Sequence, residues 1–203
     1  ITRRQHVSRH TLCHHSVCRC RTCDMPPKTK TTSAKRNTSM KSYAFGENRS
    51  ISIAKDVVTI CDSEKAKTIE LTAQRFVTFM FYLKDVDESL RKRFADDFVN
   101  FRQHIGGAWY VSVSTGFACI DIRQFYLPLY GIEEKPTKTG FAIRFSEWIA
   151  FVAAVHQLLH ENEQLADVRP CGDQHMTLED ALMCNECHPF QQAQGVMYSS
   201  TSV

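Results

Sequence analysis

The sequence predicts an α+β protein that contains two copies of one pattern, in which short strands are followed by an amphipathic helix. One segment from Phe45, FGENRSISI, matches IGGAWYVSV from Ile105 at an offset of 60 residues. A second segment from Lys67, KTIELTAQRFVTFMFYL, matches TGFAIRFSEWIAFVAAV from Thr139 at an offset of 72 residues. The second copy therefore carries 12 additional residues between its early strands and its helix. A repeat of this length indicates a whole small domain rather than a solenoid unit.

Four strands are predicted in the second copy, at residues 109–114, 117–123, 124–129 and 139–143. The first is rich in aromatic and β-branched residues. The second alternates, with Cys119, Asp121 and Arg123 on one face and apolar residues on the other. Thr115 and Gly116 predict a tight turn between them. The segment EEKPTKTG, residues 133–140, is expected to form a turn before the last strand.

One helix is predicted in each copy, because apolar residues recur three or four positions apart. In the first copy Thr72 is the expected N-cap, and the stripe is Phe76, Phe79, Met80, Leu83 and Val86. In the second copy the stripe is Trp148, Val152, Val155 and Leu159. We expect both stripes to pack in the core or between the copies. Residues 85–101 contain no Gly or Pro and are expected to extend the first helix as a link.

Composition bounds the fold and the function. The chain has 203 residues, of which 43% are hydrophobic and 23% charged, as in one or two folded domains. No apolar run reaches the roughly 18–20 residues of a membrane helix. We expect no secretory signal, because residues 1–24 are rich in Arg, His and Cys and lack an apolar centre. The odd total of nine cysteines then predicts free thiols or metal ligands rather than disulfides.

Charge is divided unevenly along the chain. Before Gly46, ten Lys and Arg face one acid, a net charge of +9. From Gly46 onward, fifteen Lys and Arg face twenty-one acids, a net charge of −6. The basic character therefore belongs to a tail, and any nucleic-acid site must lie locally on an acidic body.

Residues 1–42 are expected to form a disordered basic tail. The first Met is Met25, so residues 1–24 are interpreted as a translated leader or cloning sequence. Lysines and Arg36 in residues 25–42 fit a nuclear address or nucleic-acid steering, and equally a solubilising tail. Residues 1–24 fit a metal knuckle or, better, an unstructured segment; the ligands in question are His10, Cys13, His14, His15, Cys18, Cys20 and Cys23.

Three blocks of the second copy, IGGAWYVSV, IDIRQFYLP and KPTKTGFAIRFSEW, occur in order over about 55 residues. Together they resemble the C-terminal domain of positive cofactor four, the single-stranded-DNA-binding coactivator of RNA polymerase II. The first copy resembles the same domain more faintly and lacks the second block and the KPTKTG turn. The resemblance implies a curved antiparallel four-stranded sheet followed by one helix in each copy. It also implies an intramolecular pseudo-dimer; the alternative assembly is a homodimer formed through the second copy.

The resemblance and the residue types together predict a single-stranded-DNA site, because such sites combine cations with aromatic rings for base stacking. Arg123 stands at the family's Arg after I-D-I, Tyr126 replaces the following Trp, and Lys135 and Lys138 lie in its basic turn. The expected nucleic-acid-binding residues are Arg102, Trp109, Tyr110, Phe117, Arg123, Phe125, Tyr126, Lys135, Lys138 and Arg144. Trp148 matches the family's helix Trp and is expected in the core.

Two departures weaken the expected electrostatics. The hairpin at residues 114–118 carries no cation, although the family's first hairpin is rich in Lys and Arg. Thr139 stands where a second turn cation is expected. Residues 102–160 contain five cations and four acids, a net charge of +1. We therefore expect weaker binding than in a typical member, more dependence on the tail, and a steep fall with salt.

Near the C-terminus, Cys171, His175, Cys184 and Cys187 follow a C-x3-H-x8-C-x2-C pattern. A Cys3His set of this kind predicts a structural zinc site, with His188 as a substitute for His175. The alternative is a frayed tail with free thiols.

The predicted organisation is a tail (1–42), a degenerate coactivator-like repeat with its linking helix (43–101), a DNA-binding repeat (102–162) and a Cys/His segment (163–203). No catalytic motif is present, so we expect no enzyme. The predicted function is a nuclear single-stranded-DNA-binding transcriptional coactivator that also contacts proteins of the transcription machinery. The alternatives are a protein-interaction module on the same fold or a zinc-stabilised scaffold.

Overall fold

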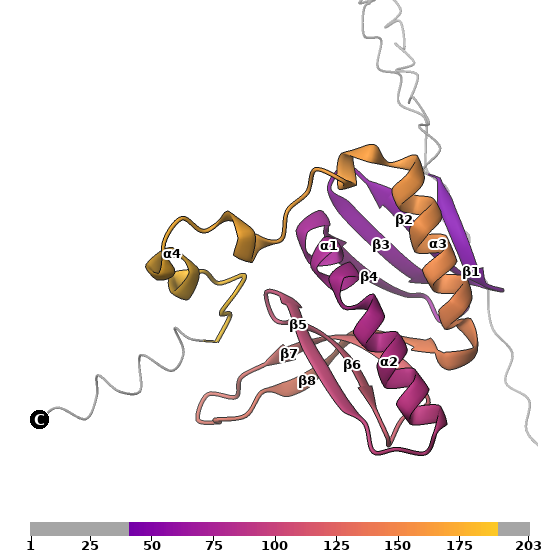
Figure 1. The fold of residues 1–203 in the computed structure, drawn as a ribbon, viewed down its shortest axis with the longest axis horizontal. Coiled ribbons are helices and arrows are strands. Elements are labelled where there is room, and N and C mark those ends of the chain that lie inside the picture. The colour runs from indigo at the N-terminus through magenta and orange to yellow at the C-terminus, as the bar shows by residue number, and fades with distance from the viewer. Residues whose placement is uncertain (1–40, 191–203) are drawn as a thin grey trace, which may run out of the picture. The chain divides into compact units, whose positions relative to one another are not determined.

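The computed structural model describes residues 41–190, which form an α+β fold with two antiparallel sheets of four strands each (Figure 1). The predicted basic tail up to residue 40, with its Cys/His cluster, lies outside the described residues. Within the described part, no helix has both the length and the apolar character needed to span a membrane.

Each sheet is a meander, in which strands adjacent in sequence pair with one another. The first sheet contains β1 (Ser42–Gly46), β2 (Arg49–Ala54), β3 (Val57–Asp62) and β4 (Lys67–Thr72). The second contains β5 (Asn100–Gly106), β6 (Trp109–Ser114), β7 (Cys119–Tyr126) and β8 (Lys135–Arg144). Short turns suffice for all of these connections because every pair is antiparallel.

The two sheets share a local irregularity at matching positions. In the first sheet the register shifts between Ala44 and Gly46, and in the second between His104 and Gly106. These positions differ by 60 residues, the offset between the two sequence patterns. The bulge therefore lies at the glycine that begins both patterns, and it bends the first hairpin of each sheet.

The second sheet differs from the sequence expectation at its far hairpin. The strands predicted at 117–123 and 124–129 are one strand, β7, which bulges between Arg123 and Phe125 and ends at Tyr126. The segment expected to be a turn lies mostly in β8, where Lys135 and Pro136 pair with Tyr126 and Phe125. Pro136 is tolerated there because β8 is an edge strand.

Thr72 caps the first helix as predicted: its hydroxyl accepts a hydrogen bond from the Arg75 backbone N–H at 3.3 Å. The helical segment is interrupted at Tyr82 and therefore forms two helices, α1 (Ala73–Phe81) and α2 (Leu83–Phe94). The prediction of a continuous link through residue 101 was wrong, because α2 ends at Phe94 and residue 101 lies in β5.

The end of α2 explains why the sequence misled. Asp96 adopts a left-handed conformation with φ of 60°. The backbone N–H groups of Asp96 and Asp97 donate to the carbonyls of Arg93 and Lys92, at 3.3 and 3.0 Å. This is a Schellman ending, for which glycine is the usual signal and Asp a rarer substitute. A segment without glycine therefore ends its helix at an aspartate.

The remaining helices follow the second sheet. A 3-10 turn (Phe145–Glu147) leads into α3 (Trp148–Glu161), and two further 3-10 turns (Glu163–Leu165 and Cys171–Gln174) precede α4 (Leu178–Met183). The first sheet is thus followed by two helices rather than the one expected, and the second by α3 and then the C-terminal Cys/His segment.

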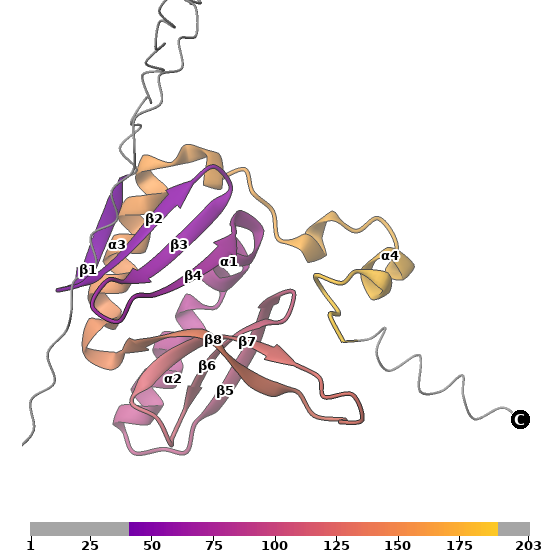
Figure 2. The same cartoon turned by 180° about the vertical axis from the view of Figure 1, so that it is seen from behind.

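The helices are exchanged between the sheets. Helix α3, which follows the second sheet, packs on β1 and β2 of the first (Figures 1 and 2). Helix α1 packs on β4 and on β5, and α2 packs on β6 of the second sheet. One hydrophobic core consequently includes residues of both sheets, and the ring of Phe151 lies 5.0 Å from that of Phe45 and 6.1 Å from that of Phe79.

A buried ion cluster also joins the two copies. Arg49 on β2 is only 9% exposed and donates to Asp62 on β3 at 3.0 Å. Its Nη1 also donates to Glu147, before α3, at 2.7 Å and to the Ala142 carbonyl on β8 at 2.9 Å. Burial of Asp62 by itself raises its pKa, but hydrogen bonds from the Lys65 N–H and from Arg49 outweigh burial and hold that pKa below its usual value. Arg49 is therefore a structural residue rather than a surface cation.

Candidate functional site

The outward face of the second sheet carries most of the predicted DNA-binding residues. Its inward face is apolar, with Val111, Ile120, Ile122 and Phe141 all buried. Strand registers place the outward residues opposite one another, with Arg102 paired to Ser112, His104 to Tyr110, and Asp121 to both Ser112 and Ala142. The alternation predicted for Cys119, Asp121 and Arg123 is thus confirmed.

Arg102 is the centre of an aromatic stack on this face. Its guanidinium carbon lies 4.0 Å from the ring centroid of Tyr110 and 4.0 Å from that of Phe125. The two rings are themselves in edge contact, with centroids 5.0 Å apart. Glu134 pairs with Arg102 and accepts a hydrogen bond from the Tyr110 hydroxyl at 2.8 Å. The result is a rigid platform of two rings and one cation, closed at its end by a carboxylate.

Tyr110 is held neutral in this arrangement. Burial, followed by the hydrogen bond to Glu134 and the charge of that carboxylate, raises the pKa of Tyr110 to about 12. The phenol therefore stays a hydrogen-bond donor at all physiological pH values. The Tyr110 ring also contacts the imidazole of His104, 5.1 Å away between centroids, and His104 in turn hydrogen-bonds with the Gly107 carbonyl.

Arg123 is anchored beside the platform. Its Nε and Nη2 donate to both carboxylate oxygens of Asp121, at 2.6 and 3.0 Å, and its Nη1 donates to the Thr137 carbonyl at 2.8 Å. The hydrogen bonds to Asp121 raise the pKa of Arg123 above its ordinary value, although partial burial opposes them. A fork held in this way is fixed in direction, but its charge is largely balanced by Asp121.

A groove of about 520 Å³ runs over Arg123. Phe117 and Phe125 both line it, and Phe117 is 68% exposed. Polar side chains fill the space between them, namely Ser112, Ser114, Asp121 and Thr137. The face therefore offers what single-stranded nucleic acid needs: exposed ring faces, hydroxyl groups and a fixed guanidinium.

The other predicted residues lie apart from the platform. Trp109 is on the inward face and 6% exposed, so its assignment to the binding surface was wrong. Its position on β6 alternates with that of Tyr110, and the period-two pattern already implied that only one of the two faces outward. Arg144, at the end of β8, pairs with Glu147 at 3.6 Å. Tyr126, Lys135 and Lys138 lie on the β7–β8 hairpin, which extends past β5 and β6 (Figure 1).

Sequence reasoning overlooked two acids that organise the site. Asp121 lies two residues before Arg123, and the strand period of two would have placed them on one face. Glu134 lies in a loop whose path no periodicity reveals, and only the structure brings it to Arg102.

The outward face of the first sheet is chemically different. Its strands alternate between a buried face and residues such as Ser50, Thr59, Cys61, Thr68 and Glu70. None of the outward positions of β2, β3 and β4 carries an aromatic ring or an arginine. The stacking platform is therefore confined to the second sheet within residues 41–190.

The four predicted metal ligands converge. The donor atoms of Cys171, His175, Cys184 and Cys187 all lie within 4.8 Å of one another. The Sγ atoms of Cys171 and Cys184 are 3.6 Å apart, and His175 Nε2 lies 3.7 Å from Cys171 Sγ and 3.3 Å from Cys187 Sγ. A zinc tetrahedron has edges of about 3.8 Å between thiolates and about 3.6 Å from thiolate to imidazole. The donors fit a metal ion of this size, and His175 rather than His188 completes the set.

The thiols of this cluster are electrostatically unequal. Burial and the neighbouring thiols raise the pKa of Cys171 to about 12. The pKa of Cys184 is lowered, chiefly by the Cys187 backbone N–H that points at its sulfur. His188 N–H donates to the Cys184 carbonyl at 2.8 Å and closes the turn. N–H groups directed at a cysteine sulfur stabilise the thiolate that a metal requires.

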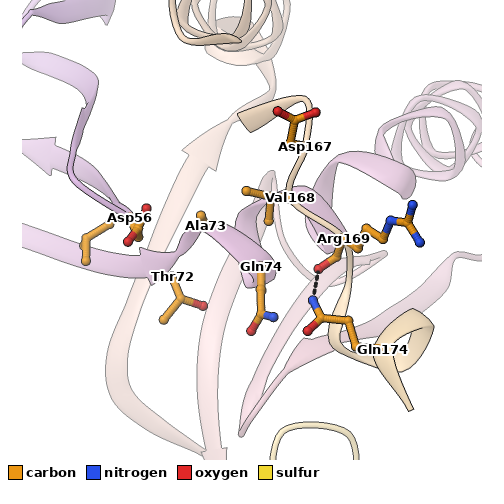
Figure 3. Close-up of a pocket in the computed structure, with 9 residues that line it drawn as sticks. Asp56, Thr72, Ala73, Gln74, Asp167, Val168, Arg169 and Gln174 are labelled. Atoms are coloured by element: carbon orange, nitrogen blue, oxygen red, sulfur yellow. Dashed lines mark hydrogen bonds between the residues drawn. The ribbon is translucent and has the colours of Figure 1, made fainter. Parts of the chain in front are cut away.

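A separate cavity of about 540 Å³ lies where the segment after α3 passes the start of α1 (Figure 3). Gln174 donates to the Arg169 carbonyl at 2.9 Å on one side, and Thr72 and Gln74 line the other. The carboxylates of Asp56 and Asp167 do not converge with the Arg169 guanidinium (Figure 3). The cavity therefore offers no set of catalytic or ligating groups.

Comparison of the chain with protein-family models, curated proteins and solved structures finds no match. The class of site is accordingly defined by its own residues: an aromatic and cationic sheet face beside a Cys3His cluster.

Proposed function

We propose that the outward face of β5–β8 binds single-stranded DNA. The observation that carries this proposal is the platform in which Arg102 stacks on both Tyr110 and Phe125, next to a groove flanked by the exposed ring of Phe117. Bases stack on such rings with little regard to sequence, and each stacked base contributes roughly 1–3 kcal/mol. The resemblance to positive cofactor four extends the proposal to a nuclear coactivator that also contacts the transcription machinery.

Charge makes the smaller contribution on this face. Arg102 and Arg123 are each paired with a carboxylate, so they orient bases and sugars better than they attract phosphates. Lys135 and Lys138 on the exposed hairpin are the cations best placed to contact phosphates. Each phosphate contact to a single strand adds about 0.7 to the steepness of the log affinity against log salt plot.

The test is fluorescence anisotropy of a labelled oligo-dT with the full chain, over a series of salt concentrations. Phe117→Ala should weaken binding at least about fivefold, the loss of one stacked base. Phe98→Ala is the matched control, because Phe98 is 83% exposed but lies in the connection between α2 and β5. Equal affinity of both variants and the unmodified chain would overturn the assignment of this face.

The charge contribution has its own test. Replacing Lys135 and Lys138 with Gln should reduce the salt slope by about 1.4, whereas the same change at Lys55 and Lys67 on the first sheet should leave it unaltered. If no oligo-dT binding is found at low salt, the face has lost its DNA contacts. The exposed loop residues Leu129, Tyr130 and Ile132, at 77%, 87% and 89% exposure, would then favour the protein-interaction alternative.

We also propose that the Cys3His cluster binds structural zinc, and that the two copies form an intramolecular pseudo-dimer with curved sheets. The donor spacings support zinc, and the exchange of α3 onto the first sheet supports the pseudo-dimer. Atomic spectroscopy should find one zinc per chain, reduced to background in Cys184→Ser. Sedimentation equilibrium should give the mass of one chain; a concentration-dependent dimer would favour the homodimer instead.

A further inference from the structure

The Cys/His module, defined here as residues 171–190, is attached to the body by one glutamate. Glu186 stands between the two cysteines of the C-x2-C pair, and its carboxylate receives both Nε and Nη2 of Arg75, at 2.5 and 2.6 Å. Its backbone carbonyl accepts from the Gly107 N–H at 2.6 Å. Both members of the ion pair are less than a quarter exposed, so this contact is partly shielded from water and salt.

The receptor for Glu186 is the bulged hairpin between β5 and β6. Gly106 and Gly107 have φ values of 117° and 56°, which favour glycine. A Cβ at Gly106 would lie 2.5 Å from the Glu186 carboxylate, and one at Gly107 would lie 2.5 Å from Arg75. The two glycines thus leave the space in which Arg75 and Glu186 meet. Arg75 comes from α1, so the junction joins the first copy, the second copy and the module.

The far end of the module reaches the DNA-binding face. Phe190 lines a cavity of about 360 Å³ together with Arg102 and Glu134. His188 and Phe190 line a second cavity, of about 430 Å³, with His104 and Tyr110. The module therefore continues the platform beyond Glu134, with a further aromatic ring and an imidazole placed next to the stacked arginine.

We infer that the Cys/His module is a wall of the single-stranded-DNA site, and that metal binding and the Glu186–Arg75 contact hold Phe190 in position to extend the stacking surface. This inference rests on the proposed DNA-binding function of the sheet face. Four ligands in one cluster restrict residues 171–187 to one arrangement. The Glu186 contacts then fix that arrangement against the β5–β6 hairpin, two residues from His188.

The experiment measures oligo-dT anisotropy and zinc content for the full chain and four variants. Glu186→Ala removes the attachment and keeps all four ligands, and Arg75→Ala removes it from the other side. Both should retain zinc and bind DNA about five- to a hundredfold more weakly, as expected when a stacked base is lost. Glu186→Ala also removes a negative charge, which by itself would favour DNA, so weaker binding cannot be a charge effect.

Glu179→Ala is the matched control, because Glu179 is an exposed acid of α4 in the same module. It should bind as the unmodified chain does. Phe190→Ala touches neither the ligands nor the Glu186 contact and should weaken binding at least about fivefold. Chelation of the unmodified chain should reproduce the loss seen in Glu186→Ala and add little to it.

The outcomes separate the inference from the proposal beneath it. No binding by the unmodified chain would overturn the proposed function itself. Binding by the unmodified chain that persists undiminished in Glu186→Ala and Phe190→Ala would overturn only the role of the module. Loss in both of these variants, with zinc content kept in Glu186→Ala and full binding in Glu179→Ala, would establish it.

Discussion

Replacing Arg49 with Met tests the buried ion cluster that joins the two copies. Arg49 is 9% exposed and pairs with Asp62 at 2.9 Å and Glu147 at 2.7 Å. Met has a similar stem but no donor, so two carboxylates would remain in a site that excludes water. Breaking a buried pair from one side costs about 3–5 kcal/mol, because a charge is left without compensation. For a domain whose total stability is about 5–15 kcal/mol, this is a large fraction.

The assay is urea denaturation of Arg49→Met, with Arg144→Met as the control. Arg144 pairs with the same Glu147, at 3.6 Å, but is 59% exposed. Its loss should cost less than about 1 kcal/mol, the usual worth of an exposed pair. A triple variant that also carries Asp62→Asn and Glu147→Gln should recover part of the loss, because no uncompensated carboxylate remains.

The pH dependence of the Arg49→Met deficit is part of the same test. In the unmodified chain the pKa of Asp62 is lowered, so its contribution to the free energy of unfolding is present above the unfolded value of about 4. That contribution is lost as the pH falls through the folded pKa. In Arg49→Met burial favours the protonated acid, so the deficit should shrink as the pH falls below about 4. An equal cost for both arginines, or no cost for Arg49→Met, would refute the reasoning.

Three further predictions concern single residues. Because the folded pKa of Tyr110 is about 12, its contribution to stability should be complete below pH of about 10 and lost as the pH rises through about 12; in an ultraviolet titration Glu134→Gln should lower that pKa, and an unshifted curve would contradict the hydrogen bond. Asp96→Val should lower the free energy of unfolding by about 1–3 kcal/mol, whereas Asp96→Gly should not lower it, because the position has φ of 60°; equal effects in urea denaturation would show that the helix ending is unstrained. Thr72→Ala should cost about 1 kcal/mol through loss of the α1 cap, with Thr72→Ser near neutral as the control for the hydroxyl; a loss in Ser equal to that in Ala would contradict the capping role.

Periodicity predicted the elements whose packing is local. The alternation around Arg123 and the stripe containing Phe76 and Phe79 follow from one buried face each, and Phe76 and Phe79 are fully buried. The ends of elements were harder to predict. Asp96 replaces the expected glycine at the end of α2, and Pro136 lies in an edge strand rather than in a turn. In both cases tertiary contacts decide between conformations that the local sequence allows.

The candidate site divides in the same way. The four metal ligands were found from their spacing alone, because the chemistry of zinc restricts residue type and separation so strongly. The platform residues came from the resemblance, but their partners did not. Glu134 reaches Arg102 across 32 residues, and Glu186 reaches Arg75 across 111 residues. Contacts of this sequence separation leave no periodic trace and depend on the fold as a whole.

The exchange of helices has a consequence for synthesis of the chain. The inward face of the first sheet is covered by α3, and the Phe45 ring meets Phe151, which is made more than a hundred residues later. At a rate of about 5–20 residues per second, the first sheet spends several seconds or more with this face uncovered. We therefore expect the ribosome-bound first half to depend on a chaperone until α3 emerges, and the finished chain to fold slowly because its core is made from distant segments.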